Sequence, residues 1–231
     1  MKTGPGRGSA GCSASAEREM GVNLDHIVVA AATLGEGRAW MEERIGLPPG
    51  GGGKHPFMGT ENALWRLGQS YLEVIAVDPD AGRPAHPRWF GLDDPIQTAR
   101  LAERPHLITW VLKTVDIEGL RRAGPIDPGP SVTQTRGDLY WHITIRTDGA
   151  LNAGGAFPYF IHWPVGVPAP PERLPDQGLT LTEFTCLAPE EGLAEALHAI
   201  GASDLLSLEL SDGPQRLRAQ ITTPSGEVVL D

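Results

Sequence analysis

Hydrophobic and polar residues follow a pattern along the chain that repeats three times. The run from Leu24, LDHIVVAA, is typical of a β-strand, and in the following GEGRAWMEERIG the apolar residues Leu34, Met41 and Ile45 recur at helical spacing. After a glycine-rich stretch come ALWRLG and SYLEVIAV, two strand-like runs separated by a Gly-Gln turn. The pattern predicts a β-α-β-β unit with room for a short extra strand near Lys54.

The same order of elements returns twice. HLITWVLKTVDIEGLRRAG is typical of a strand that leads into a short helix, and DLYWHITIRT and AFPYFIHWPV follow it as strands. A third pass begins at LTLTEFTCLAP, continues with a helix whose apolar stripe is Leu193, Leu197 and Ile200, and ends in strands around an Asp212-Gly213 turn. We therefore expect an α+β fold built from repeated βαβββ-like units.

The repeats also define the expected domains. Residues 1–21 hold few side chains that can be buried, so we expect a disordered tail there. Residues 22–168 are expected to form one domain of two units, 22–104 and 105–168, and residues 169–231 a third unit packed on it. Since the third unit has no fourth partner, its sheet edge should either pack on the paired units or pair with its copy in a homodimer.

Composition and charge narrow the class of protein. The 231 residues include 19 basic and 29 acidic ones, a net charge of −10, so nucleic acid and anionic membrane surfaces are expected to be repelled. The longest strongly apolar stretch, Ile27 to Leu34, is far shorter than the roughly 20 residues that span a bilayer. Cys12 and Cys186 are the only cysteines and support no disulfide framework. We expect a cytoplasmic protein.

Several runs resemble the vicinal oxygen chelate superfamily, which includes glyoxalase I, extradiol dioxygenases and bleomycin-resistance proteins. The resemblance rests on the repeated units, on a His in LDHIVVAA and on a Glu in SYLEVIAVD. It is strongest to the glyoxalase-like branch, through GGGKHPFMGTENALWRLG, YLEVIAVDPD, RWFGLDD and the pair DLYWHIT with YFIHW. It implies that two units close around a central cavity, where the first and last strands of each unit lie side by side and supply metal ligands.

Carried over residue by residue, the resemblance assigns the ligand positions. His26 and Glu73 take those of the first unit, and Thr109 and His162 those of the second. Thr109 is a poor ligand and His162 replaces the usual carboxylate, so the implied set is His26, Glu73 and His162. Two imidazoles and one carboxylate suit a divalent metal such as Zn, Fe(II), Mn or Ni.

The residues themselves leave structural alternatives open. A carboxylate in the middle of SYLEVIAV is costly to bury unless it is paired, protonated or bound to metal, so Glu73 needs a partner such as His26 whether or not the site is catalytic. By period-two alternation and alignment of the repeats, His162 is expected on the sheet face that carries Glu73. From that position it could ligate a metal or donate a hydrogen bond to a ligand.

Other residues are candidates for contact with a substrate. His55, Thr60 and Asn62 lie in KHPFMGTEN, where they either line the cavity or satisfy the local turn. Trp89 in RWFGLDD could cap an apolar pocket or attach its loop to the core. His142 lies on the polar face of its strand, which either lines the cavity or faces water.

Two functions follow from these candidates. In the first, His26, Glu73 and His162 hold a divalent ion that polarises vicinal oxygens of a small-molecule substrate, and His26 and Glu73 act as catalytic residues of a lyase, isomerase or dioxygenase. In the second, the chain is a metal-free protein of bleomycin-resistance type that binds or sequesters a small molecule. Thr109 favours the second or a three-ligand site, whereas the retained His26 and Glu73 favour the enzyme.

Overall fold

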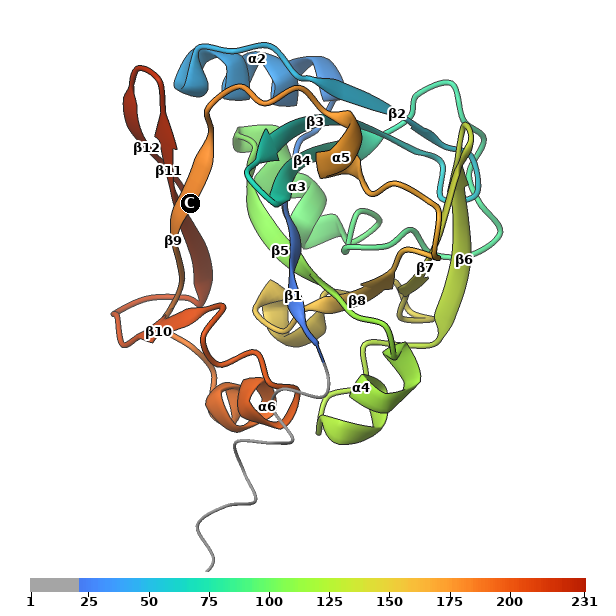
Figure 1. Cartoon of the computed structure of the whole chain (residues 1–231), viewed down its shortest axis with the longest axis vertical. Helices are drawn as coiled ribbons and strands as arrows, with labels where there is room; N and C mark the ends of the chain where they lie inside the picture. The colour runs from blue at the N-terminus through green and yellow to red at the C-terminus, as the bar shows by residue number, and fades with distance from the viewer. Residues whose placement is uncertain (1–20) are drawn as a thin grey trace, which may run out of the picture.

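The computed structural model describes residues 21–231, so the predicted tail lies almost wholly outside the described residues. Eight strands form one strongly curled sheet in the order β2-β3-β4-β1-β5-β8-β7-β6, and a second sheet lies near the C-terminus (Figure 1). The predicted α+β fold of repeated βαβββ units is confirmed. No helix of the described part is long and apolar enough to cross a membrane.

The curled sheet consists of two units with the same internal order. β1 pairs with β4 and β5 pairs with β8, both in parallel, while β1 and β5 join the two units as antiparallel neighbours. The first unit contains β1 (Asn23–Ala30), α2 (Leu34–Ile45), β2 (Gly51–His55), β3 (Thr60–Leu67) and β4 (Ser70–Val77). The second contains β5 (His106–Lys113), α4 (Ile117–Ala123), β6 (Ser131–Arg136), β7 (Leu139–Thr144) and β8 (Tyr159–His162).

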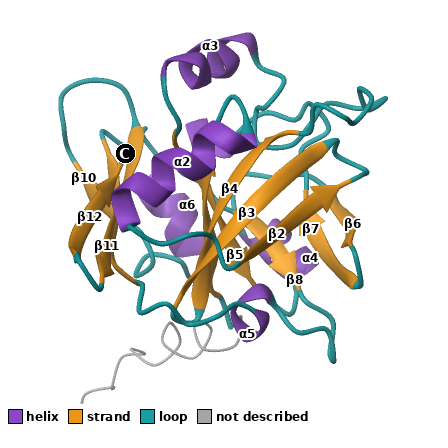
Figure 2. Ribbon diagram, turned by 90° about the horizontal axis from the view of Figure 1, so that it is seen from above, coloured by secondary structure: helices purple, strands orange, loops and turns teal. Residues whose placement is uncertain are grey.

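The helix of the first unit has clear sequence signals at both ends. The hydroxyl of Thr33 accepts a hydrogen bond from the backbone N–H of Glu36 at 3.2 Å, which satisfies one of the free donors of the first turn. Gly46 ends α2 in the left-handed conformation with a φ of 72°, and Met41 and Ile45 are buried on the face toward the sheet. These caps place α2 over the outer face of β3 and β4 (Figure 2).

The connections hold short helices that the hydrophobic pattern does not predict. Between β4 and β5 lies α3 (Pro95–Glu103), whose first turn is capped by the carboxylate of Asp94 and begins with a proline. The 3₁₀ turn η1 (Asn152–Gly155) precedes β8, and α5 (Pro170–Arg173) follows it. Proline and aspartate are common both in turns and at the first positions of helices, so these residues alone do not distinguish a loop from a short helix.

The C-terminal part forms a separate four-stranded sheet. Its order is β10-β9-β11-β12, so the first strand, β9, pairs with β10 and β11, whereas in the first two units the first strand pairs with the last. The element order βαβββ is therefore shared, but the strand pairing is not. The elements are β9 (Thr180–Leu187), α6 (Leu193–Ala199), β10 (Ser207–Glu209), β11 (Arg216–Thr223) and β12 (Gly226–Leu230).

This second sheet packs on the convex face of the curled sheet. Phe184, Leu217 and Ile221 share one apolar core with Trp110 and Phe160, and the rings of Trp110 and Phe184 meet edge to face at 5.6 Å. The outer strands β10 and β12 have no further neighbour among the described strands. Pairing of such an edge with a second copy stays a prediction, which sedimentation at micromolar concentration tests.

Alternation along the central strands separates two cores. On β1, Ile27 and Val29 belong to the convex core, whereas Val28 and Ala30 belong to the core inside the curl. The same alternation on β4 directs Leu72 outward. Polar side chains at the alternate positions of these strands therefore face the inside of the curled sheet.

One glycine allows the curl to close tightly around β5. Gly155 has a φ of 98°, and a Cβ atom there would lie 1.9 Å from the carbonyl oxygen of Ile108. We expect Gly155→Ala to lower the free energy of unfolding by about 2 to 3 kcal/mol more than Gly137→Ala, because Gly137 has a positive φ but open space around it. Urea denaturation of both variants measures the difference, and equal losses would contradict the close-approach explanation.

Candidate functional site

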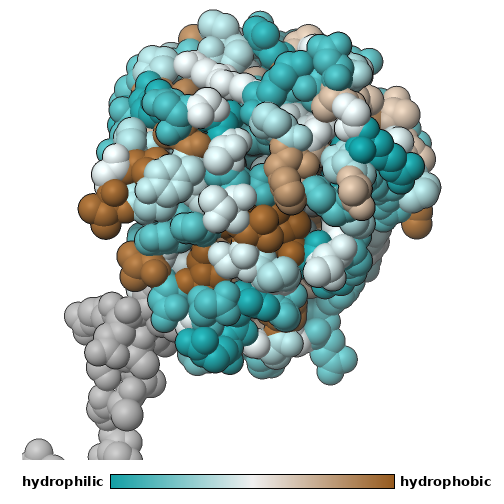
Figure 3. Space-filling view, turned by 90° about the vertical axis from the view of Figure 1, so that its right-hand side faces the viewer, coloured by the Kyte–Doolittle hydropathy of each residue, from teal (hydrophilic) through white to brown (hydrophobic). Residues whose placement is uncertain are grey.

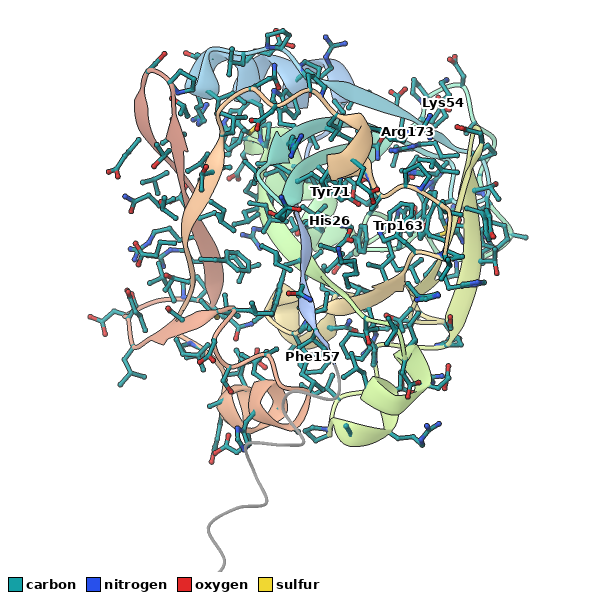
Figure 4. All side chains as sticks on the ribbon, viewed as in Figure 1. His26, Lys54, Tyr71, Phe157, Trp163 and Arg173 are labelled. Carbon is teal, nitrogen blue, oxygen red and sulfur yellow. The ribbon has the colours of Figure 1, made fainter. Side chains whose placement is uncertain are left out.

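The site begins with the parallel pairing of β1 and β4. His26 lies opposite Tyr71 and Val28 lies opposite Glu73, so the side chains of His26, Tyr71 and Glu73 share the concave face of the sheet. Asn62 joins them from β3, where it lies opposite Ile75 of the same face. Figure 4 shows His26 and Tyr71 inside the curl, near Trp163.

A row of buried polar contacts crosses this face. The His26 ring has its Nδ1 at 2.7 Å from Asp25 Oδ1 and its Nε2 at 3.5 Å from Glu73 Oε2. The Trp163 indole N–H donates to Asp25 Oδ2 at 2.9 Å, and the Asn62 amide donates to Glu73 Oε1 at 2.5 Å. Each carboxylate therefore has the histidine on one oxygen and a neutral donor on the other.

Asp25 reaches His26 and Trp163 because the strand is irregular there. The pairing of β1 with β5 shifts its register between Leu24 and His26, which leaves Asp25 as the extra residue of a bulge. Regular alternation would direct neighbouring side chains to opposite faces, so the sequence pattern could not reveal Asp25. No other signal in the chain marks this bulge.

The histidine and its glutamate hold each other in charged form. Burial lowers the pKa of His26, but the hydrogen bonds to Asp25 and Glu73 outweigh it and raise the pKa from 6.5 to about 9. Burial raises the pKa of Glu73, and the contacts with His26, followed by His55 and Asn62, reverse this and lower the pKa from 4.5 to about 2. At neutral pH the site contains an imidazolium between two carboxylates.

A second, neutral group of polar residues lies beside the first. His55 has its Nδ1 at 3.1 Å from the Thr60 hydroxyl and its Nε2 at 3.4 Å from the Asn62 amide nitrogen. Burial lowers the pKa of His55 to about 4, so its Nε2 accepts from Asn62 while its Nδ1–H donates to Thr60. Arg136 donates from its Nη1 to Asn62 Oδ1 at 3.0 Å. Asn62 thus joins the second group to Glu73.

Aromatic side chains form the remaining walls. The rings of Trp141 and Trp163 lie 5.4 Å apart, and His55 has edge contacts with Trp89 at 5.0 Å and with Trp141 at 5.9 Å. Tyr71 stacks on His26 with 4.4 Å between ring centres. The polar row is therefore enclosed by flat apolar surfaces.

These residues surround a narrow cavity. It encloses about 330 Å³ that protein atoms do not fill, of which about 20 Å³ admits the centre of a water molecule. That central space is enough for about one water molecule. A larger flat molecule can enter only if some aromatic walls move apart.

The structure brings most of the predicted site residues together. His26, Glu73, His55, Asn62 and Trp89 all line the cavity. Thr60 is buried behind His55 and supports that ring by its hydroxyl. Trp89 also stacks on Phe90 in the inner core. Its side chain therefore both borders the cavity and attaches its loop to the core.

The prediction that His162 shares a face with Glu73 is wrong. Ile161 lines the cavity, whereas His162 has its Nδ1 at 3.1 Å from the Thr114 carbonyl oxygen and stacks with His142 at 6.1 Å. The alignment of the two repeats that places His162 over Glu73 is wrong by one residue in β8. A shift of one residue moves a strand side chain to the opposite face of the sheet. His142 is its partner across β7 and β8, outside the cavity lining.

Strand pairing corrects the alignment of the second unit. Tyr159 lies opposite Val111 as Tyr71 lies opposite His26, so Val111 and Ile161 occupy the places of His26 and Glu73. Thr109, predicted at the first-strand position, instead donates its hydroxyl to the Gly155 carbonyl at 3.2 Å. The second unit therefore presents two apolar side chains at the positions where the resemblance implies metal ligands.

The donors present do not fit a divalent metal. The part of the chain that the structure describes has no group of three His, Cys, Asp or Glu side chains that could hold an ion. His26 Nε2 and Glu73 Oε2 lie 3.5 Å apart without a third His, Cys, Asp or Glu donor of the described residues grouped with them, and His26 Nδ1 is in contact with Asp25. Zn, Fe, Mn or Ni would find at most one histidine and one adjacent carboxylate group here.

Comparison with known proteins agrees with this fold. The family model described as a glyoxalase-like domain matches residues 24–201. The chain belongs to the glyoxalase-like domain family. The family lies within the vicinal oxygen chelate superfamily, as the resemblance of the sequence implies. No curated protein matches the chain.

Solved structures share the fold of this glyoxalase-like protein at low sequence identity. A hypothetical protein from Staphylococcus aureus aligns with a TM-score of 0.55 and 13% identity over 91% of this chain and 84% of its own. The methylmalonyl-CoA epimerase from Mycobacterium tuberculosis aligns with a TM-score of 0.40 and 16% identity over 61% and 87% of the two chains.

Proposed function

We propose that this glyoxalase-like protein binds a small, flat organic molecule in the cavity between its two units, without a metal ion. The observation that carries the proposal is the composition of the cavity. Tryptophan and histidine rings lie around a row of fixed polar groups, and the second unit adds Ile143 and Ile161. Apolar walls with a few well-placed polar groups are typical of small-molecule sites.

The fixed charges favour binding over acid–base catalysis. A general base works best when its pKa lies near the working pH, and His26 holds the pKa of Glu73 at about 2. The metal-dependent lyase, isomerase or dioxygenase that the sequence also suggested would need further ligands. Its second-unit positions hold Val111 and Ile161, which cannot ligate a metal.

The proposal predicts ligand binding that is independent of metal. Protein purified without chelator or His tag is expected to hold well below one equivalent of Zn, Fe, Mn or Ni, and EDTA should leave the Kd for 2-naphthamide or benzamide unchanged in calorimetry. Trp141→Leu should weaken binding by about tenfold, since it removes one wall of the cavity. Trp40→Leu is the matched control, because Trp40 lies on α2 beneath Arg44 and outside the cavity.

Two results would overturn the proposal. One is a stoichiometric metal ion whose removal abolishes binding, which would restore the metal-dependent enzyme. The other is the same loss of affinity for Trp141→Leu and Trp40→Leu, because binding in the cavity requires a difference between them.

A further inference from the structure

Arg136 lies where the cavity meets a wider groove on the surface. The groove holds about 1100 Å³ of space that protein atoms do not fill, open to solvent, between the edge strands β2 and β6 and beside α5; we call it the outer groove. Arg136 and Pro170 line both the outer groove and the cavity. Figure 4 shows Lys54 and Arg173 on the same side of Trp163, and Figure 3 shows that this side of the molecule mixes hydrophilic and hydrophobic side chains.

The glycines of β2 leave room for this arginine. A Cβ atom on Gly53 would lie 2.9 Å from Arg136 Cδ and 3.2 Å from its Cγ, so the stem of Arg136 rests directly on the backbone of β2. Gly53 itself does not have a positive φ. Glycine is therefore needed at position 53 because a side chain would collide with Arg136, and not because of the backbone conformation.

Arg136 carries a charge that no carboxylate offsets within the described part of the chain. Lys54 is 2.8 Å from Asp78, and Arg173 is 3.1 Å from Asp138. Arg136 has no such ion pair among the described residues, and its side-chain hydrogen bond goes to the neutral amide of Asn62. An arginine has five N–H donors in a planar fork that matches a carboxylate, so most of its capacity is free at the mouth of the cavity.

Buried polar groups without partners lie on the same side of the sheet. Trp89 lines the cavity, and its indole Nε1 is buried without a hydrogen-bond partner among the described residues. Gln134 is 1% exposed, and both atoms of its amide lack partners. It lies two residues before Arg136 on β6, opposite Trp141. Buried polar groups are normally satisfied, so the Trp89 N–H, which lines the cavity, indicates a water or a ligand with an acceptor atom there.

We infer that the molecule bound by this protein is a planar carboxylic acid, whose carboxylate is held by the Arg136 guanidinium where the cavity opens into the outer groove. This inference rests on the proposed function and names the class of its ligand. The ring of the acid packs against the tryptophan walls once these have moved apart to admit it, and the Trp89 N–H is available to an acceptor on it. The aliphatic stem of Arg136 is positioned by Gly53.

A cationic ligand fits the same cavity less well. Aromatic walls and a carboxylate favour a cation in general, but Glu73 already faces protonated His26. A ligand ammonium group would also meet Arg136, which has no carboxylate to screen it. A ligand carboxylate meets a free guanidinium instead, and its repulsion from Glu73 is offset by His26.

The test compares acids with their neutral amides. Calorimetry at pH 7 measures benzoate against benzamide and 2-naphthoate against 2-naphthamide, which have the same shape and differ in charge. We expect the acid of at least one pair to bind tenfold or more tightly than its amide. Arg136→Gln should remove this preference, so that acid and amide bind this variant with Kd values within about twofold of each other. Arg173→Gln is the matched control and should keep the preference, since Arg173 is already paired with Asp138.

A second variant moves Arg136 without changing its charge. Gly53→Ala should reduce the preference for the acid by several-fold, and the double variant with Arg136→Gln should lose no more than Arg136→Gln alone. Wild-type protein that binds acid and amide equally overturns the inference but leaves the proposed function standing. Wild-type protein that binds none of the four probes overturns both. A preference that survives Arg136→Gln overturns the assignment of Arg136.

Discussion

Replacing His26 with alanine is expected to lower the free energy of unfolding by about 3 to 5 kcal/mol at pH 7. Asp25 and Glu73 are 3% and 5% exposed, and without the imidazolium they become two buried negative charges with no cation between them. Trp163 and Asn62 still donate hydrogen bonds to them but add no charge. Urea denaturation with a fixed-slope analysis measures the loss.

The pH dependence separates this mechanism from simple loss of packing. Uncompensated carboxylates become easier to keep buried once they are protonated, so the deficit of His26→Ala should shrink as the pH falls from 7 toward 4. Val28→Ala is the matched control, because Val28 is fully buried on the same strand and does not titrate, so its deficit should be the same at both pH values. A deficit of His26→Ala that is the same at both pH values would contradict the charge argument.

The fold could be predicted because the sequence shows clear strand patterns and clear helical spacing of its apolar residues. Alternating and continuous apolar runs mark β1, β4, β5 and β8, and caps such as Thr33 and Gly46 mark the helix of the first unit. The C-terminal sheet shows the limit of this reasoning. Its elements come in the predicted order, but β9 pairs with β10 and β11 and not with the last strand β12, and strand pairing depends on contacts that no local pattern encodes.

The candidate site could be predicted only in its first unit. His26 and Glu73 stand out because polar side chains inside apolar strands need partners. Asp25 was missed because a bulge breaks the alternation, and His162 was misplaced because the repeats were aligned without knowledge of strand register. Arg136 gives no signal at all, since it lies at the end of a polar edge strand and meets Asn62 across 74 residues of sequence.

The wild-type protein is expected to be most stable near pH 6.5 and to lose stability on both sides of it. The pKa of His26 is raised to about 9 in the folded chain, so its contribution is complete below pH 6.5 and is lost as the pH rises toward 9. The pKa of His55 is lowered to about 4 by burial, so the unfolded chain takes up a proton that the folded chain refuses as the pH falls from 6.5 to 4. The free energy of unfolding should fall by on the order of 3 kcal/mol on each side of pH 6.5.

Variants assign the two sides to their groups. His55→Gln should flatten the decline between pH 6.5 and 4, apart from the smaller part due to His106, and leave the alkaline side unchanged. Glu73→Gln removes one of the two carboxylates that raise the pKa of His26, so the alkaline decline should be smaller and should end at a lower pH. Urea denaturation at half-unit steps from pH 4 to 9 measures both profiles. A flat wild-type profile between pH 6.5 and 9 would show that His26 is not held as an imidazolium, and the charge pattern on which ligand selection depends would then have to be reassigned.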